Sequence, residues 1–147
     1  MRVLFLCTGN SCRSQMAEGW LRHLAGSRID VESAGLEAHG LNPAAVQAMA
    51  DRGIDISAQT SKVVDAAMVA RANLVVTVCG HADAHCPVLP PTVIKQHWPF
   101  EDPARVAGDA ATIKRAFEET CRAIEARVRT FLAGYQGEGS RNGWPGA

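Results

Sequence analysis

The residues best suited to chemistry in this chain are residues 7–14, which read Cys-Thr-Gly-Asn-Ser-Cys-Arg-Ser. Five residues separate Cys7 from Arg13, which places a thiol at the base of a loop and a guanidinium at its far end. Positive charge favours the thiolate, so we expect the pKa of Cys7 to lie well below the free value of about 8.5 and Cys7 to act as a nucleophile. Arg13 offers a planar fork of donors to a tetrahedral oxyanion, and Ser14 can donate its hydroxyl to the attacking or leaving sulfur.

Two elements must position this loop. Residues 3–6 form an apolar run that predicts a short buried strand, and apolar side chains recur at helical spacing over residues 16–24. The loop is therefore a strand-to-helix turn, which aims backbone N–H groups and the positive end of a helix dipole at one point. The residues expected to bind an oxyanion there are Thr8, Gly9, Asn10, Ser11, Cys12 and Arg13. The alternative is an inert, buried strand-end cysteine beside a capping arginine.

A second pair of cysteines, Cys79 and Cys86, is separated by six residues, a spacing wider than a redox C-x-x-C motif or the usual zinc knuckle. A zinc site would recruit His81 and His85, but no well-spaced second pair of ligands follows, so we expect no metal and treat both histidines as solvated bystanders. The spacing alone is a weak signal, and the positions of the two cysteines favour a disulfide relay. Cys79 follows a predicted strand and can approach Cys7, while Cys86 lies on a segment rich in proline.

A carboxyl group completes the candidate site. Asp102 precedes Pro103 in a stretch with apolar neighbours, which would desolvate the carboxyl and raise its pKa toward use as a general acid. The alternative is an aspartate that turns the chain into its last helix.

The remaining pattern indicates an α/β fold with a mostly parallel sheet and helices on both faces. We expect further strands at residues 30–34, 74–78 and 93–97, and helices from 43 to about 53, at 64–72 and from about 109 to 132. Cys121 lies on the apolar stripe of the last helix and is expected in the core. Ligands bind at the carboxyl ends of strands in such sheets, so Cys7, Cys79 and Asp102 should converge.

Length and composition limit the function. The 147 residues predict one domain, residues 1–133, followed by a glycine-rich flexible tail, residues 134–147. The formal net charge is zero, so we expect no nucleic-acid or membrane partner. The opening apolar run is too short for a signal peptide or a membrane span, which indicates a cytoplasmic protein. In that reducing compartment the five cysteines favour redox or metal chemistry over structural disulfides, and we expect a monomer without a cofactor.

From Arg2 to about Leu132 the sequence resembles the thioredoxin-coupled arsenate reductases, a branch of the low-molecular-weight protein tyrosine phosphatase fold. The resemblance implies a four-stranded parallel sheet and the reduction of arsenate to arsenite. The segments that carry it are Cys7 to Ser14, Gln15-Met16-Ala17-Glu18-Gly19-Trp20, Ser33-Ala34-Gly35, Asn42-Pro43, Leu74-Val75-Val76-Thr77, Cys79 with Cys86-Pro87, Leu89-Pro90-Pro91, His97-Trp98 and Asp102-Pro103.

The resemblance also implies a mechanism. Cys7 would attack arsenate held by the loop and Arg13, with Asp102 helping the departing oxygen leave as water; phosphate and sulfate would compete for the same loop. Cys79 would then attack the Cys7 sulfur and release arsenite. Cys86 would attack Cys79, and thioredoxin or another small thiol system would reduce the resulting disulfide.

Two other functions remain open from the sequence. A phosphatase would use the same loop and hydrolyse a thiol-phosphate on Cys7 with the help of Asp102. Phosphatases of this fold usually carry aromatic residues after the Asp-Pro pair, where this chain has Ala104-Arg105, and they need no second cysteine pair, so weak phosphatase turnover is the most we expect. A thiol-based arsenite or zinc sensor would use the three relay cysteines as metal ligands and would show no turnover.

One residue departs from the family pattern. Some members bind potassium near the loop, through residues that match Asn10, Glu18, Ser33 and Thr60 together with an aspartate where this chain has Lys62. A lysine removes an anionic ligand and brings its own positive charge. We therefore expect the Lys62 ammonium to replace the ion, to hydrogen-bond toward Asn10 or Glu18 and to stabilise the loop; the alternative is an exposed lysine in a loop.

Overall fold

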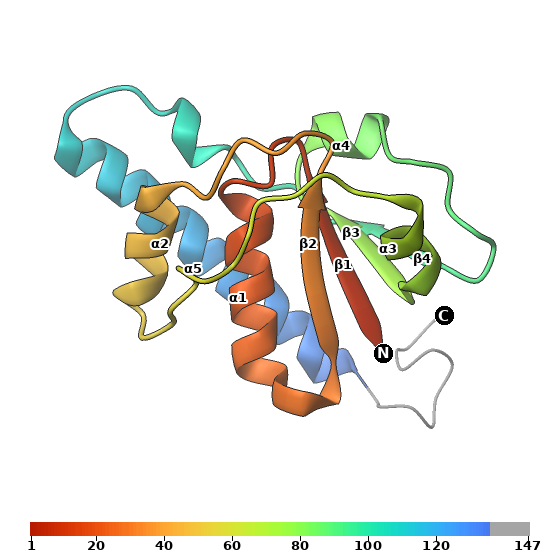
Figure 1. Cartoon of the computed structure of the whole chain (residues 1–147). Helices are drawn as coiled ribbons and strands as arrows, with labels where there is room; N and C mark the ends of the chain where they lie inside the picture. The colour runs from red at the N-terminus through yellow and green to blue at the C-terminus, as the bar shows by residue number, and fades with distance from the viewer. Residues whose placement is uncertain (136–147) are drawn as a thin grey trace.

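The structure is a computed structural model that describes residues 1–135. Its centre is a four-stranded sheet in the order β2-β1-β3-β4, in which every neighbouring pair is parallel. The carboxyl ends of the strands meet at one edge, at the top of Figure 1. The predicted four-stranded parallel sheet is confirmed. The strands are β1 (Arg2–Cys7), β2 (Asp30–Gly35), β3 (Leu74–Thr77) and β4 (Ile94–His97).

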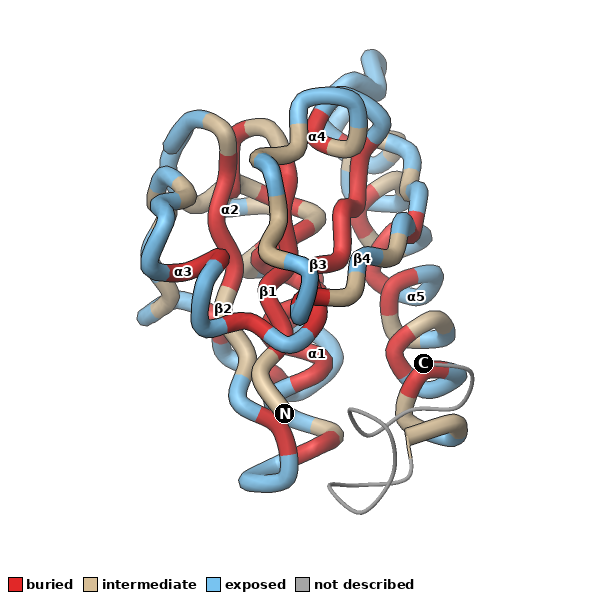
Figure 2. The backbone as a smooth tube through the Cα atoms, turned by 90° about the vertical axis from the view of Figure 1, so that its right-hand side faces the viewer, coloured by how far each residue is buried: buried red, intermediate tan, exposed pale blue. Residues whose placement is uncertain are grey.

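Helices cover both faces of the sheet, as predicted. In Figure 1, α1, α2 and α5 pack together on one face and α3 and α4 lie on the other; Figure 2 views the molecule from the side of α3 and α4. The helices are α1 (Arg13–Ala25), α2 (Pro43–Ala50), α3 (Ala66–Arg71), α4 (Gly80–Ala84) and α5 (Ala110–Gly134), with short 3-10 turns η1 (Gly26–Arg28) and η2 (Pro103–Arg105).

The two central strands form the core. The four residues Val3 to Leu6 of β1 are at most 1% exposed, and the same holds for β3. A strand covered by helices on both faces needs apolar side chains in both directions, which explains why these segments read as unbroken apolar runs. In Figure 2 the strand β3 is therefore drawn as buried, whereas the edge strand β4 is only partly buried. The buried central strands give the loop at their carboxyl edge a rigid support.

Helix α5 closes the core with one apolar stripe, as its periodicity predicts. Phe117, Ile124, Val128 and Phe131 are buried on it. Cys121 lies on the same stripe, is 1% exposed and accepts a hydrogen bond from the Trp20 indole nitrogen at 3.4 Å. The prediction that Cys121 is a core residue is confirmed.

Capping side chains set the starts of two other helices. Pro43 is the first residue of α2, and Asn42 Oδ1 accepts a hydrogen bond from the Ala44 amide at 2.8 Å. Asp65 Oδ1 accepts from the Met68 amide at 2.8 Å. Because Asp65 is the N-cap, α3 begins two residues later than the predicted start at residue 64.

The predicted domain boundary lies close to the end of α5. The helix ends at Gly134, one residue beyond the predicted end of the domain. Most of the predicted tail, from residue 136 onward, lies outside the described residues. No helix within residues 1–135 is both long enough and apolar enough to cross a membrane.

Candidate active site

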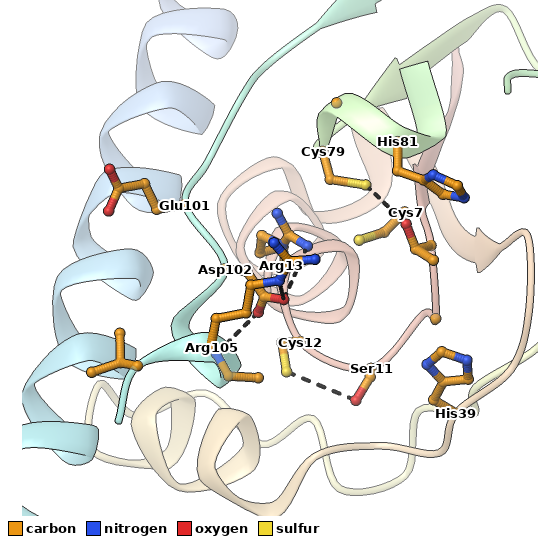
Figure 3. A pocket seen from close by; sticks show the side chains of 15 residues that line it. Cys7, Ser11, Cys12, Arg13, His39, Cys79, His81, Glu101, Asp102 and Arg105 are labelled. Atoms are coloured by element: carbon orange, nitrogen blue, oxygen red, sulfur yellow. Dashed lines mark hydrogen bonds and ion pairs between the residues drawn. The ribbon is translucent and has the colours of Figure 1, made fainter. Parts of the chain in front are cut away.

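The candidate site is an open pocket of about 890 Å³ at the carboxyl ends of β1 and β3 (Figure 3). In the sheet order β2-β1-β3-β4, the chain continues from β1 to β2 on one side and from β3 to β4 on the other. The connections after β1 and β3 therefore diverge and leave a crevice between the carboxyl ends of these two strands. Cys7, Cys79 and Asp102 all line this pocket, which confirms their predicted convergence. The loop after β1 forms its base, and Arg13 projects into it from the start of α1.

Asn10 holds the loop in shape. Its φ of 48° lies in the left-handed region, which asparagine tolerates better than most residues. The buried Nδ2 donates to Ser14 Oγ at 2.9 Å and Ser33 Oγ at 3.0 Å. Its Oδ1 accepts from the Lys62 amide at 2.9 Å and from Gln15 Nε2 at 3.1 Å. Side chains or backbone from three other parts of the chain therefore fix this one strained residue.

The outer side of the loop is braced by the segment that follows β2. The carbonyl oxygens of Cys7, Thr8 and Gly9 accept backbone hydrogen bonds from that segment at 3.0, 2.8 and 2.8 Å. The segment packs so tightly that a Cβ atom on Gly9 would lie 2.3 Å from the His39 ring. A larger residue at position 9 would require the exposed His39 side chain to move. The carbonyls are turned toward the bracing segment, an arrangement suited to a loop that binds anions through its N–H groups.

Arg13 and Asp102 face each other across the pocket. An Arg13 Nη donates to the Phe100 carbonyl at 2.9 Å, and the other lies 3.6 Å from Asp102 Oδ2. The Arg105 Nε is 3.8 Å from the same carboxylate oxygen. The expectation of apolar neighbours around Asp102 is therefore wrong, because two guanidinium groups flank it. Asp102 also accepts from the Ala104 amide at 3.0 Å and so caps η2, whereas the last helix has its own N-cap, Asp109. The role of Asp102 as a general acid stays a prediction.

Cys7 and Cys79 form a hydrogen-bonded pair of buried thiols that titrates as a unit. The hydrogen bond with Cys7 lowers the pKa of Cys79 to about 4, assisted by Thr8 Oγ1 at 3.3 Å and the Ala82 amide at 3.4 Å. The same hydrogen bond, followed by burial, raises the pKa of Cys7. In this coupled pair the pKa of Cys7 shifts in the direction opposite to the expected one, and its role as the nucleophile stays a prediction. On the lowered pKa of Cys79 we assign the first negative charge of the pair to Cys79.

The third cysteine of the predicted relay lies apart from this pair. Cys86 follows the end of α4, is half-buried and does not line the pocket; burial raises its pKa. His81 and His85 are exposed and their rings lie 4.3 Å apart, and His81 reaches the pocket rim. All five cysteines are thiols. Within residues 1–135 no group of three or more histidine, cysteine or acidic side chains gathers as metal ligands.

Ser14 is fully buried, and its Oγ accepts the hydrogen bond from Asn10. Its predicted assistance to the Cys7 sulfur stays a prediction. Sequence reasoning missed Arg105 and His39 as pocket residues. His39 follows β2, so the rule that located the cysteines, proximity to the carboxyl end of a strand, would have found it too.

Lys62 contacts Asn10 in a different way from the one predicted. Its backbone amide, not its ammonium, reaches Asn10, while Nζ donates to the Thr60 carbonyl at 3.3 Å. Glu18 pairs with Arg22 instead of the Lys62 ammonium, and an Arg22 Nη lies 2.7 Å from Glu18 Oε2. The expected hydrogen bond from the Lys62 ammonium to Asn10 or Glu18 is therefore wrong. The buried Glu18 also accepts from Ser33 Oγ at 2.6 Å.

The fold and the loop define the class of protein. The family model for low molecular weight phosphotyrosine protein phosphatase matches residues 2–141. The chain therefore belongs to the low molecular weight phosphotyrosine protein phosphatase family. A solved low-molecular-weight protein tyrosine phosphatase from T. tengcongensis has the same fold, with a TM-score of 0.76 at 24% identity over 90% of this chain and 98% of that chain.

Within this family the chain is similar to arsenate reductases, which confirms the resemblance. The arsenate reductase of Bacillus subtilis (strain 168) is 51% identical over 129 residues, which cover 88% of this chain and 93% of that protein. A solved structure of an arsenate reductase in its phosphate-binding state has a TM-score of 0.73 at 35% identity, covering 90% of this chain and 96% of that one. The thioredoxin-dependent arsenate reductase of Corynebacterium glutamicum has a TM-score of 0.71 at 30% identity, over 90% of this chain and 60% of that chain.

Proposed function

We propose that this protein is an arsenate reductase that converts arsenate to arsenite through a relay of Cys7, Cys79 and Cys86, with thioredoxin as the reductant. The observation that carries the proposal is a second buried thiol, Cys79, which lines the same pocket as Cys7 at the base of an oxyanion loop. A hydrolytic phosphatase needs one nucleophilic thiol, whereas a reductase needs a second thiol within reach of the first. The similarity to arsenate reductases supports the same conclusion.

Arsenate binding is the first step. Arsenate is a tetrahedral oxyanion, and the N–H groups of residues 8–13, the start of the 13-residue helix α1 and the Arg13 guanidinium all favour such an anion. Phosphate and sulfate have the same shape and charge, so they compete for the loop. Arg105 adds a second positive group at the rim, 3.8 Å from Asp102.

The nucleophilic step uses the shared proton of the thiol pair. As the Cys7 sulfur attacks arsenic, its proton passes along the hydrogen bond to the Cys79 thiolate. One oxygen of arsenate leaves as water, and Asp102 lies in the pocket to assist that departure. The product is a Cys7–arsenate thioester in which arsenic is still pentavalent. Cys79 serves as the base for this step because it carries the first charge of the pair.

Reduction of arsenic is the second step. Cys79 gives its proton to an oxygen of the bound arsenic and, as a thiolate stabilised by Thr8 Oγ1 and the Ala82 amide, attacks the Cys7 sulfur. The electron pair of the sulfur–arsenic bond moves to arsenic, which leaves as trivalent arsenite. The two sulfurs are oxidised by two electrons and form the Cys7–Cys79 disulfide, so the electrons balance without a cofactor.

Regeneration is the third step. Cys86 attacks Cys79, the Cys7 thiolate leaves, and the oxidation moves to a Cys79–Cys86 disulfide that thioredoxin reduces. We further propose that the protein works in the cytoplasm as a monomer, where thioredoxin is available.

The test is arsenite formation by the purified protein with thioredoxin, thioredoxin reductase and NADPH, compared with a glutaredoxin-type donor and with the Cys7→Ala variant. We expect turnover with thioredoxin, slower turnover with the other donor and none in the variant. Hydrolysis of a phosphomonoester faster than arsenate reduction would instead assign the phosphatase activity of the wider family. Arsenite formation by Cys7→Ala at the wild-type rate would refute the assignment of Cys7 as the nucleophile.

A further inference from the structure

The last transfer of the relay requires a change of shape in α4. Cys79 and Cys86 lie on either side of this helix, seven residues apart. At a helical rise of 1.5 Å per residue, their Cα atoms would be about 10 Å apart. A disulfide needs Cα atoms within about 4.4–6.8 Å, so α4 must unwind or bend before Cys86 can attack. Whatever holds α4 closed therefore controls the transfer.

Helix α4 is held at its polar side by Asp83. The Asp83 Oδ1 accepts from Thr77 Oγ1 at 2.9 Å and from Lys95 Nζ at 2.8 Å. Lys95 Nζ also lies within 3.4 Å of the Asp83 carbonyl, and His97 Nδ1 is 3.8 Å from Oδ1. Thr77 ends β3, while Lys95 and His97 belong to β4, so one side chain of the helix is tied to two strands.

The charge of Asp83 is matched to these contacts. Hydrogen bonds from Lys95 and then Thr77 lower the pKa of Asp83, so the side chain is a carboxylate at neutral pH. Thr77 is buried, whereas about a third of the Asp83 and Lys95 side chains is exposed. A partly exposed contact of this kind is weak enough to break during turnover. It is still strong enough to change the fraction of molecules in which α4 is closed.

Two other contacts hold α4, and one of them depends on the redox state. Ala82, a residue of α4, is fully buried. The Cys79 sulfur is the N-cap, accepting from the Ala82 amide at 3.4 Å. Once Cys79 is bonded to Cys7, the sulfur loses its negative charge and becomes a weaker acceptor. Asp83 is then the main polar contact that keeps α4 closed.

We infer that Asp83 is a positioning residue of the relay, which holds α4 closed and so sets the rate at which Cys86 takes the oxidation from Cys79. The inference rests on the proposed function. In the closed state Cys79 stays beside Cys7, available for arsenic reduction, and an early Cys79–Cys86 disulfide is prevented. When α4 opens after arsenite release, Cys86 attacks Cys79, and the Cys79–Cys86 disulfide that forms is the one that thioredoxin reduces.

The first experiment needs no arsenate. The reduced protein is treated with oxidised glutathione, and formation of the Cys79–Cys86 disulfide is followed by peptide mass spectrometry. Asp83→Ala should form it about tenfold faster, and Asp83→Asn, which keeps an acceptor for Thr77, should lie between. The control is Asp109→Ala, which removes another carboxylate that holds a helix: Asp109 is exposed and is the N-cap of α5, where it accepts a hydrogen bond from the Thr112 amide at 2.8 Å.

The second experiment follows one turnover with arsenate. Asp83→Ala should release its single equivalent of arsenite no faster than the wild type and then lose the Cys7–Cys79 disulfide about tenfold faster. A general loss of structure would slow both phases, so this split separates positioning from folding. If Asp83→Ala does not fold, Lys95→Met removes two of the contacts and should show the same direction.

Equal rates of Cys79–Cys86 disulfide formation in Asp83→Ala, Lys95→Met and the wild type would overturn the inference and leave the reductase proposal standing. Absence of arsenite from the wild type, with the glutathione result as expected, would overturn the proposed function and leave Asp83 as the residue that holds α4. A slower transfer in Asp83→Ala would overturn the inference as well.

Discussion

Removal of the Cys7 sulfur should move the charge that the reduced site carries. In the wild type the hydrogen bond from Cys7 is the largest cause that lowers the pKa of Cys79, from its ordinary value of 9.0 to about 4. Cys7→Ala deletes that donor and leaves Cys79 with Thr8, Ala82 and the more distant Arg13. At pH 7 a thiol with a pKa of 4 is almost wholly ionised, while one with a pKa of 9 is about 1% ionised.

The assay is the absorbance of thiolate at 240 nm during a pH titration of the reduced protein. Burial raises the pKa of Cys12, Cys86 and Cys121, so these three thiols stay silent below pH 8. The wild type should show one thiolate with a midpoint near 4, and Cys7→Ala should shift that midpoint upward toward 9.0. Cys86→Ser is the matched control and should titrate like the wild type.

The same pair predicts the direction of a stability change with pH. A thiol whose pKa is lowered by folding stabilises the folded state fully above its unfolded pKa of about 8.5, and this contribution is lost as the pH falls through the folded value. The thermal midpoint of the wild type should therefore exceed that of Cys79→Ala most at pH 9, and the gap should narrow progressively toward pH 4. A gap that widens on acidification, or a thiolate midpoint that Cys7→Ala leaves unchanged, would refute the assignment of the charge to Cys79.

Three further predictions concern the relay and the loop. Cys86→Ser should release one equivalent of arsenite and then stop with a Cys7–Cys79 disulfide, detected by quenched-flow product analysis and mass spectrometry; steady cycling with thioredoxin would contradict the relay. Arg13→Lys should lower kcat/KM at least a hundredfold, because an ammonium cannot make the paired contacts of a guanidinium, and steady-state kinetics would measure it. Lys62→Met should change kcat/KM less than about twofold in potassium or sodium buffer, because the backbone amide that holds Asn10 remains; a tenfold loss would restore a role for the ammonium.

The sequence predicts the parts of this molecule that local patterns control. The apolar runs of β1 and β3, the helical stripe of α5 and the loop between Cys7 and Arg13 each depend on residues close in the chain. Parallel strand order then follows from the alternation of elements, and it brings Cys79 and Asp102 to the loop. For these reasons the parallel sheet and the convergence of Cys7, Cys79 and Asp102 were predictable.

The errors concern contacts between segments far apart in the chain. Cys7 and Cys79 are 72 positions apart, and their shared proton depends on which way two side chains point. The residues next to Asp102 in the sequence predicted an apolar environment for its carboxyl group. Instead Arg13, which is 89 positions away in the chain, lies close to that group. Lys62 was correctly predicted to contact Asn10, but the contact is made by its backbone amide and not by its ammonium group. Residue spacing does not indicate which of these two donors makes a contact.

The network around Asn10 has a consequence for selectivity. Because Ser14, Ser33, Gln15 and the Lys62 amide fix the loop from within the fold, its shape is set before any oxyanion arrives. A rigid cradle for a tetrahedral dianion has no means of telling arsenate from the far more abundant phosphate. Discrimination then falls to the chemistry that follows, since arsenic can accept the electron pair of the sulfur bond and phosphorus does not. The enzyme would therefore sort its substrates by reducibility, and cellular phosphate would set the fraction of time in which the loop is available to arsenate.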